Sequence, residues 1–407
     1  MKTCNTYIKC FIIALIVLFS NKISAAESMK SIDFVSDSIR ISLLTCSPHD
    51  EIYSLYGHTA IRYEDKTKGI DIAINYGVFS FKQPYFILRF VFGITDYQIG
   101  IENFSDFCNE YKSYGSSVTQ QTLNLNSEEK ALFIKALAEN YSEENRTYRY
   151  NYFYNNCTTK ARDLLISSIQ GKLIYKNHID PNLSFREIIH SCNNAHRWAR
   201  FGNDILLGIN ADKSTSRQDQ QFLPYNLQKD FDYAYIIGTN GKVRPLINER
   251  KSIMSSCQNK SEKGVFTPTI VFTIFFCFII LLCAIELFTK KRLNIIDTIL
   301  QLILGCIGIL LFIMIFSEHP STSINLQIIL FNPIFIYIAF DNIRYRNEIN
   351  KLKRNSLVSV IIIILAILGG LIQTYAEGIT ILALSLLLRY LVIYIQFRKQ
   401  QKNRIQQ

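Results

Sequence analysis

The last third of the chain contains five long apolar runs, at residues 265–288, 295–316, 324–340, 356–375 and 377–396. Each is close to the roughly 20 residues that an α-helix needs to cross the hydrocarbon core of a bilayer. These runs limit the fold strongly, because a segment in lipid must satisfy its backbone hydrogen bonds internally, as a helix does. The sequence therefore predicts an all-α transmembrane domain of five helices over residues 263–407.

The connections between these runs predict the topology. Lysine and arginine occur after the first run, between the third and fourth, and after the fifth, whereas residues 317–323 and the turn near Ala376 contain neither. Since basic loops stay in the cytoplasm, we expect an inner-membrane protein with a periplasmic N-terminal domain and a cytoplasmic C-terminus. Much of the net charge of +11 then follows from topology. No basic cluster in the N-terminal part indicates nucleic-acid binding.

Among the ionisable residues inside the apolar runs, one acidic and one basic residue lie far along their runs. Glu286 and Arg389 lie in the first and fifth runs, near their cytoplasmic ends. Long polar side chains at such positions usually extend to the aqueous interface. We therefore expect both side chains to reach the cytoplasmic surface.

The start of the chain is typical of a secretory signal peptide, over residues 1–26. Lys2 and Lys9 precede an apolar run from Phe11 to Phe19, and Ser24-Ala25-Ala26 supplies the small residues of a cleavage site. Export of the following residues agrees with the topology that the loop charges predict. Residues 27–262 are thus expected to form a periplasmic domain.

Apolar periodicity predicts an α+β fold for this domain. Alternating apolar and polar residues indicate strands near 53–63, 70–76, 96–101 and 118–125, and a helix pattern begins at Ser127. Neighbouring strands joined by short polar turns favour an antiparallel sheet with helices packed on it.

Residues 150–165 combine a strand pattern with a helix pattern, and Cys157 lies where they meet. Asn156 is a good N-cap residue and Thr158 suits the first turn. The helix N-terminus favours a thiolate. Polar neighbours argue against a buried structural cysteine, the usual fate of a free one. We predict a nucleophile, with Asn156, Thr158 and the N–H groups at the helix start as candidate oxyanion groups.

A thiol nucleophile needs a base within hydrogen-bond reach. His58, in Tyr56-Gly57-His58-Thr59 on a predicted strand, is the candidate. A strand histidine alone is more often a structural residue, but its pairing with Cys157 favours the catalytic role. Asn75, on the next predicted strand, is a candidate for orienting the imidazole.

The remaining cysteines and histidines favour no metal site. The exported domain contains Cys46, Cys108, Cys157, Cys192 and Cys257. An odd number in an oxidising compartment leaves at least one thiol unpaired, while the pairing of the other four stays open. His190, Cys192 and His196 have the short spacing of zinc ligands but lack a fourth ligand. We expect neither a metal nor a cofactor.

The segments Tyr56-Gly57-His58-Thr59-Ala60-Ile61-Arg62, Asn75-Tyr76-Gly77 and Asn156-Cys157-Thr158-Thr159, with Trp198 and Leu207-Gly208 after them, resemble the Lnb family. Its members are lipoprotein N-acyltransferases of Bacteroides and relatives, with a periplasmic domain followed by a membrane-spanning part. The resemblance covers nearly the whole mature chain and implies that Cys157 is the nucleophile and His58 the base. The order of His before Cys also resembles the permuted papain-like group of NlpC/P60 and lecithin–retinol acyltransferase type.

The resemblance implies transfer of an acyl chain from a membrane phospholipid to the α-amino group of a diacylglyceryl-cysteine lipoprotein, through a thioester on Cys157. Two alternatives stay open at this point. A cell-wall peptide amidase of NlpC/P60 type would use the same Cys–His pair, although five membrane spans weigh against it. A non-catalytic scaffold would bind lipoproteins without forming an acyl-enzyme.

Overall fold

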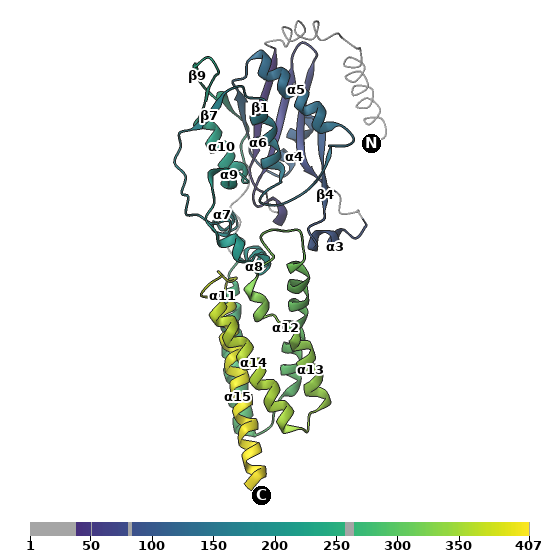
Figure 1. Cartoon of the computed structure of the whole chain (residues 1–407), viewed down its shortest axis with the longest axis vertical. Helices are drawn as coiled ribbons and strands as arrows, with labels where there is room; N and C mark the ends of the chain where they lie inside the picture. Colours follow the sequence, from purple (N-terminus) through teal and green to yellow (C-terminus); the bar gives the residue numbers. More distant parts are fainter. Residues whose placement is uncertain (1–37, 50, 80–83, 257–263, 407) are drawn as a thin grey trace.

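The computed structural model describes residues 38–49, 51–79, 84–256 and 264–406. The predicted signal peptide and Cys257 lie outside these residues. The described chain has two parts, an α+β domain and a bundle of long helices, joined end to end (Figure 1). Both predicted fold classes are confirmed.

The N-terminal part contains a seven-stranded antiparallel sheet of order β10-β5-β1-β2-β3-β4-β6. Its strands are β1 (Ile39–Cys46), β2 (His58–Asp65), β3 (Ile70–Val78), β4 (Asp96–Asn103), β5 (Val118–Leu123), β6 (Thr147–Arg149) and β10 (Ile247–Met254). A smaller sheet, β7-β8-β9, consists of β7 (Lys172–Tyr175), β8 (Ala234–Ile237) and β9 (Val243–Pro245).

Different helices cover the two faces of the large sheet, because successive side chains of a strand point to opposite sides. Leu43 of β1 belongs to the main core, with Phe133 of α5 (Ser127–Tyr141) and Leu165 of α6 (Cys157–Ser167). Its neighbour Leu44 packs on the other face, with Phe107 of α4 (Phe104–Ser113). The alternation predicted from the sequence thus divides the sheet between α5 and α6 on one face and α4 on the other.

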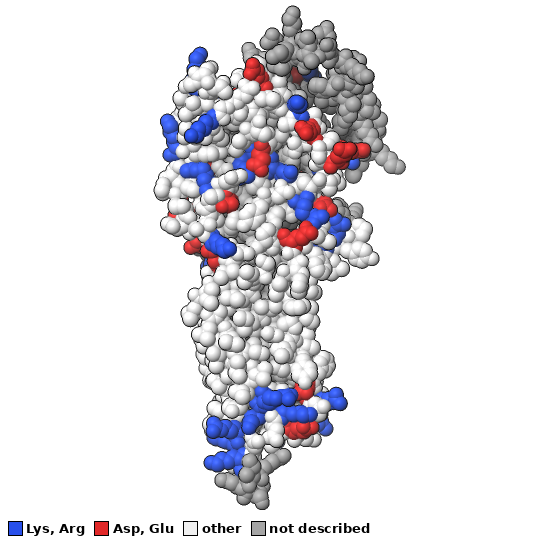
Figure 2. All heavy atoms as spheres, viewed as in Figure 1, with Lys and Arg blue, Asp and Glu red and all other residues white. Residues whose placement is uncertain are grey.

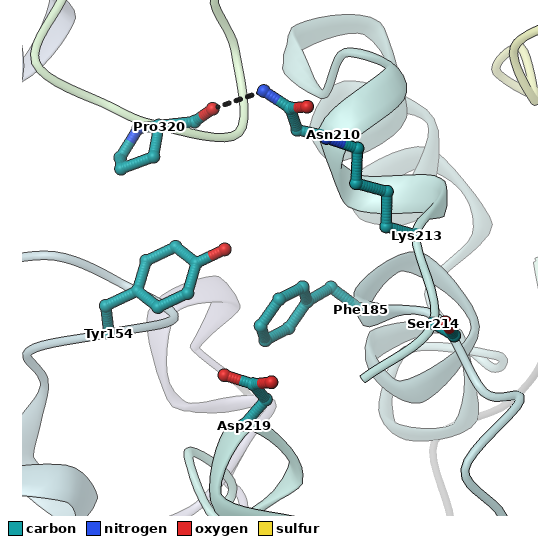
Figure 3. A pocket seen from close by; sticks show the side chains of 7 residues that line it. All are labelled: Tyr154, Phe185, Asn210, Lys213, Ser214, Asp219 and Pro320. Atoms are coloured by element: carbon teal, nitrogen blue, oxygen red, sulfur yellow. Dashed lines mark hydrogen bonds between the residues drawn. The ribbon is translucent and has the colours of Figure 1, made fainter. Parts of the chain in front are cut away.

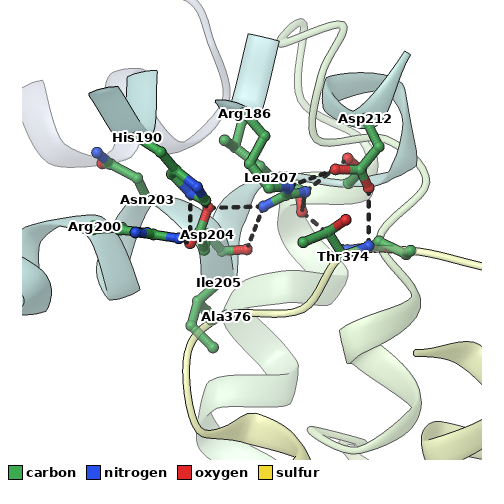
Figure 4. A network of polar contacts seen from close by, with 12 residues as sticks. Arg186, His190, Arg200, Asn203, Asp204, Ile205, Leu207, Asp212, Thr374 and Ala376 are labelled. Atoms are coloured by element: carbon green, nitrogen blue, oxygen red, sulfur yellow. Dashed lines mark hydrogen bonds and ion pairs between the residues drawn. The ribbon is translucent and has the colours of Figure 1, made fainter. Parts of the chain in front are cut away.

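Four short helices follow in the described chain: α7 (Phe185–Cys192), α8 (Arg197–Leu206), α9 (Arg217–Gln220) and α10 (Pro224–Asp232). Of these, α7 and α8 lie next to the membrane part, whereas α10 packs on the main core of the α+β domain (Figure 1). A buried polar network at α7 and α8 connects the two parts of the protein (Figure 4). Arg186 donates to Asp204 (2.9 Å) and to Asp212 (2.6 Å). Asp212 in turn accepts from the backbone N–H of Thr374 (3.1 Å), and the Gln327 side chain donates to the carbonyl of Asp204 (2.7 Å).

The C-terminal part consists of α11 (Pro268–Thr289), α12 (Asn294–Ile315), the 3-10 turn η4 (Leu326–Ile329) followed by α13 (Ile334–Arg344), α14 (Ile349–Gly369) and α15 (Ile379–Gln406). Within the described residues, five segments are long and apolar enough to cross a membrane, and the third combines η4 and α13. Figure 2 shows a wide band without charged side chains below the α+β domain, and a group of basic side chains at the far end. The predicted five spans are confirmed.

The expectation that Glu286 and Arg389 reach the cytoplasmic interface is wrong. Arg389 is fully buried, and its guanidinium forms ion pairs with Glu286 (2.7 Å) and Asp297 (2.7 Å). A charge inside a bundle is stabilised when partners from other helices satisfy it. These ion pairs connect α15 with α11 and α12.

Candidate active site

The nucleophile candidate Cys157 is the first residue of α6, and its backbone is fixed by the residue before it. The Asn156 side chain accepts from the N–H groups of Thr158 and Thr159 (2.9 Å each). The same amide donates to the carbonyls of Tyr152 and Phe222 (2.9 Å each). Asn156 is therefore a buried N-cap that holds the start of α6 in place.

This cap changes how an oxyanion can be bound. The N–H groups of Thr158 and Thr159 are engaged by Asn156, so they are not free for a substrate while the cap is intact. The backbone N–H of Cys157 makes no hydrogen bond within the described part of the chain. Among the backbone N–H groups at the start of α6, that of Cys157 is therefore the one that remains to bind an oxyanion.

The surroundings of the Cys157 sulfur favour the thiolate. Burial alone would raise the pKa of this thiol, but the charge and hydrogen bond of His58 oppose burial, and the Thr59 N–H and Thr158 hydroxyl add to them. The pKa of Cys157 is lowered from 9.0 to about 7. A thiol with this pKa is about half ionised at neutral pH.

His58 belongs to a chain of hydrogen bonds that orients its ring. Its Nε2 lies 3.0 Å from Oδ1 of Asn75, and Nδ2 of Asn75 donates to Oε1 of Glu102 (2.6 Å). Because the Glu102 carboxylate can only accept, it directs the amide so that Oδ1 faces His58. Nε2 of His58 then donates to Asn75, and Nδ1 is the ring nitrogen that remains to contact Cys157.

The sheet register brings Asn75 and His58 together. Ala60 of β2 lies opposite Asn75 of β3, so His58, two residues along β2, is a diagonal neighbour of Asn75 on the same face. Glu102 of β4 is a diagonal neighbour of Asn75 on the same face, because Glu102 lies opposite Ala73, two residues before Asn75 on β3. The α4 residue Tyr111 stacks on the His58 ring, with ring centroids 6.2 Å apart.

The ionisation of His58 is coupled to that of Cys157. Burial by itself lowers the pKa of His58, but the Cys157 thiolate, the Asn75 hydrogen bond and the charge of Glu110 together raise it above its ordinary value. Burial and the charge of Glu110 raise the pKa of Glu102, against the donor from Asn75. The thiolate and the imidazolium thus stabilise each other, so the two charges tend to form together.

Gly77 and Tyr148 complete the wall beside the thiol. Gly77 has a φ of +88°, and a Cβ there would lie 3.6 Å from Cβ of Cys157 and 3.9 Å from the Tyr148 hydroxyl. The Gly77 N–H approaches the Tyr148 oxygen, yet this buried hydroxyl has no hydrogen-bond partner of normal geometry among the described residues. Its proton is therefore available to a ligand at Cys157.

Glu102 and Tyr148 cannot be recognised as site residues from sequence patterns alone. Glu102 sits just past the predicted strand 96–101, and only the pairing of β3 with β4 brings it to Asn75. Tyr148 belongs to the alternating Tyr148, Tyr150 and Tyr152, which indicates a strand but not which hydroxyl lacks a partner. The positions of both residues at the site depend on contacts between segments that are distant in sequence.

Of the other thiols and histidines, Cys46 lies next to the site, directly opposite His58 in the register of β1 with β2, whereas His190 and Cys192 belong to α7. Cys46, Cys108 and Cys192 are free like Cys157. His190 bonds to the Asp204 carboxylate (2.8 Å) within the junction network, and the Cys192 sulfur contacts the carbonyl of Ile188 (3.9 Å). Within the described ranges, no group of three or more His, Cys, Asp or Glu is arranged to hold a metal ion.

A surface pocket of about 260 Å³ opens beside the site, between the α+β domain and the loop that carries Pro320 (Figure 3). Its walls include the ring of Tyr154 and the ring of Phe185, with the carboxylate of Asp219 below them. Tyr154 lies three residues before Cys157, but Cys157 does not line the pocket.

Comparison with known families gives two matches. The Lnb N-terminal periplasmic domain matches residues 28–191, and the Lnb transmembrane domain matches residues 260–401. The first match contains His58, Asn75, Glu102, Tyr148 and Cys157. No curated protein and no solved structure matches the chain.

Proposed function

Because the chain belongs to the Lnb family, we propose that it is a thiol-dependent lipoprotein N-acyltransferase. The donor is a membrane phospholipid, and the acceptor is the α-amino group of a diacylglyceryl-cysteine lipoprotein. The observation that carries the proposal is the contact between Cys157 and His58, which lowers the pKa of the thiol to about 7. A nucleophile and a base in hydrogen-bond contact are the minimum for covalent acyl transfer.

In the first half-reaction the Cys157 thiolate attacks the ester carbonyl carbon of the phospholipid. The carbonyl oxygen becomes an oxyanion, and the ester C–O bond then breaks. The leaving alkoxide takes its proton from the His58 imidazolium and departs as a lysophospholipid. Cys157 now carries the acyl chain as a thioester, and His58 is neutral.

In the second half-reaction the neutral α-amino group of the lipoprotein attacks the thioester. His58 accepts a proton from the attacking nitrogen, the C–S bond breaks, and the amide product leaves. Thiolate and imidazolium are restored, so no further co-reactant is needed. This order of steps requires ping-pong kinetics.

We assign the oxyanion to two donors, the Tyr148 hydroxyl and the Cys157 N–H. Two observations support this assignment. The buried Tyr148 hydroxyl has no hydrogen-bond partner of normal geometry among the residues that the structure describes. Gly77 lies between this hydroxyl and Cys157. Loss of one such donor usually costs about 10²–10³ in kcat. Tyr148→Phe should therefore lower the rate of thioester formation by about that factor, and Tyr76→Phe is the matched control. An unchanged rate in Tyr148→Phe contradicts the assignment.

Asn75 and Glu102 are proposed as positioning residues. Asn75 holds Nε2 of His58, and Glu102 holds the orientation of Asn75. Neither is proposed to touch substrate. Their role is to keep Nδ1 directed at the thiol through both half-reactions, as outer partners do for a catalytic histidine.

The proposal is tested by trapping the acyl-enzyme. The purified full-length protein, in vesicles of phospholipid with isotope-labelled acyl chains and without acceptor, is digested with trypsin. The peptide 150–160 contains Cys157 as its only cysteine. We expect a labelled, hydroxylamine-sensitive acyl group on this peptide in wild type and in the control Cys108→Ala.

The same experiment decides between the functional classes. Addition of a diacylglyceryl-cysteine peptide should discharge the thioester and yield the N-acylated peptide. Cleavage of cell-wall peptides without lipid-derived acylation would instead favour an amidase. Absence of any acyl-enzyme and of any cleavage would favour a scaffold.

A further inference from the structure

The short helix α3 (Phe86–Val91) presents large apolar side chains to the outside of the protein. Tyr85 is 78 % exposed, Ile87 76 % and Leu88 56 %, and Phe90 and Phe92 are also exposed. A soluble domain rarely gathers so many large apolar side chains on one short exposed segment without a binding partner.

The one charged residue of this segment is turned toward the protein. Arg89 forms an ion pair with Asp96 (2.7 Å), which also binds Arg149 (2.8 Å). Arg149 continues to Glu318 (2.5 Å), on the loop after α12. The outward side of residues 85–92 is thus apolar and uncharged.

The position of α3 is fixed relative to the membrane helices. The Phe92 carbonyl accepts from the N–H of Glu318 (2.9 Å), and Nε2 of His319 lies 2.9 Å from the carbonyl of Phe90. A Cβ on Gly93 would lie 3.0 Å from the backbone nitrogen of His319. These contacts hold α3 against the loop that joins α12 to the third span, at the end of the bundle nearest the α+β domain (Figure 1).

The opposite side of the junction also shows residues typical of a membrane interface. Trp198 of α8 is 47 % exposed, and its indole donates to the carbonyl of Phe266 (2.8 Å), just before α11. Exposed tryptophan at the end of a membrane helix is typical of the headgroup region. Figure 1 shows α3 and α8 on the two sides of the junction, both next to the same end of the bundle.

We propose that α3 is an interfacial helix that lies in the outer leaflet of the membrane with Ile87 and Leu88 among the acyl chains. The occupant of this apolar surface is lipid, because the adjoining surface of the helix bundle is covered by lipid as well. Apolar side chains on a short helix with its polar groups turned inward are suited to the boundary between headgroups and acyl chains. The bilayer surface then reaches the lower edge of the large sheet.

This placement deepens the proposed function and, in its consequence for catalysis, rests on it. A row of aromatic contacts leads from α3 toward the nucleophile. Phe86 stacks on Phe79 (5.8 Å between ring centroids), Phe79 contacts Tyr97 (4.9 Å), and Tyr97 stacks on Tyr150 (4.1 Å). Tyr150 packs on the same core cluster as Cys157. These rings form a continuous apolar layer between α3 and the core cluster against which Cys157 packs.

The test uses tryptophan fluorescence and does not depend on turnover. The chain has a single tryptophan, Trp198, so Trp198→Phe provides a silent background. Ile87→Trp is compared with Val243→Trp, whose native side chain is 62 % exposed and lies on β9 at the far end of the α+β domain. Both full-length proteins are placed in vesicles of ordinary or bromine-labelled phosphatidylcholine.

Brominated chains should quench the emission of the Ile87→Trp protein by about twofold or more, because the indole lies at acyl-chain depth. The emission of the Val243→Trp protein should stay unquenched. Equal, unquenched emission from both proteins would overturn the proposal. Quenching of the Ile87→Trp protein that appears only on its dilution in lipid would indicate that a second copy covers this surface and would also overturn the proposal.

An activity measurement separates this inference from the proposed function. Ile87→Asp with Leu88→Asp should lower acylation of Cys157 by phospholipid about tenfold by weakening interfacial binding, while its alkylation by a water-soluble reagent stays unchanged. Val243→Asp is the control. If the enzyme proposal fails, no acyl-enzyme forms in any variant, yet the quenching of the Ile87→Trp protein persists.

Discussion

Replacing His58 by alanine should return the Cys157 thiol to a high pKa. Burial raises the pKa of Cys157, and the His58 charge and hydrogen bond are the main effects that lower it to about 7. Without the imidazole, burial still raises the pKa of Cys157, and most of the influences that lower this pKa are lost. The midpoint of thiolate formation should move from about 7 to about 9 or above.

The size of the effect on reactivity follows from two opposing factors. A pKa of 9 leaves about 1 % thiolate at pH 7, against about half in wild type, which is a loss of about fiftyfold. A more basic thiolate is intrinsically more nucleophilic, by about eightfold for this difference in pKa. The net alkylation rate at pH 7 should therefore fall about sixfold, whereas the midpoint should shift by about two units.

The assay is alkylation by iodoacetamide across pH 5 to about 11, which reaches about two units below the wild-type midpoint and about two units above that of the variant, followed by mass spectrometry of tryptic peptides. Peptide 150–160 reports Cys157, and peptide 90–112 reports Cys108, a partly buried internal control whose pKa is raised by burial. His178→Ala, at an exposed histidine, is the matched variant. A midpoint that stays near 7 in His58→Ala would refute the argument and assign the thiolate to the helix start alone.

Three further predictions concern the surroundings of the site. Gly77→Ala should destabilise the protein by about 1–2 kcal/mol in thermal unfolding, because of its φ of +88°. It should also impair acylation more than Gly241→Ala, which has a similar φ in open space. Glu102→Ala should slow acylation about tenfold by releasing Asn75, and Glu102→Gln, which keeps an acceptor, should recover most of the rate. Arg186→Ala should lower the free energy of unfolding by about 3 kcal/mol, measured in detergent, because Asp204 is 1 % exposed.

The sequence was sufficient where the physical cause is local. Alternating residues in β1 to β3 predicted the sheet, apolar runs predicted the five spans, and Asn156 and Thr158 predicted the start of α6 at Cys157. In each case the pattern lies within one segment. Local sequence also suggested that His58 and Asn75 share one face, because they lie on consecutive strands.

What the sequence could not supply are contacts set by register and by helix rotation. Glu102 reaches Asn75 only through the register of β3 with β4, and Arg389 meets Asp297 across 92 residues. A position near a helix end is compatible with a side chain that turns outward or inward. Burial of Arg389 depends on which face of α15 packs against α11 and α12, and that rotation is a property of the whole bundle.

The coupling between Cys157 and His58 has a consequence for the order of the two half-reactions. Before the proposed acylation, burial lowers the pKa of His58, while the thiolate is the largest of the influences that raise it, so the thiolate makes the ring hold its proton more tightly. Formation of the thioester removes the thiolate charge, and the pKa of His58 must fall. The same ring then becomes a base, at the moment when the incoming amine has a proton to give up.

This change of role also favours an amine that arrives neutral. An α-amino group has an ordinary pKa near 8, so at neutral pH a minor fraction is ready to attack. A surface that draws the lipoprotein's acyl chains toward the leaflet would lessen hydration of its ammonium form and increase that fraction. In the proposed reaction, the coupled Cys157–His58 pair and the proposed interfacial helix α3 would therefore act on the same step. The pair would provide the base, and the helix would favour the neutral form of the attacking amine.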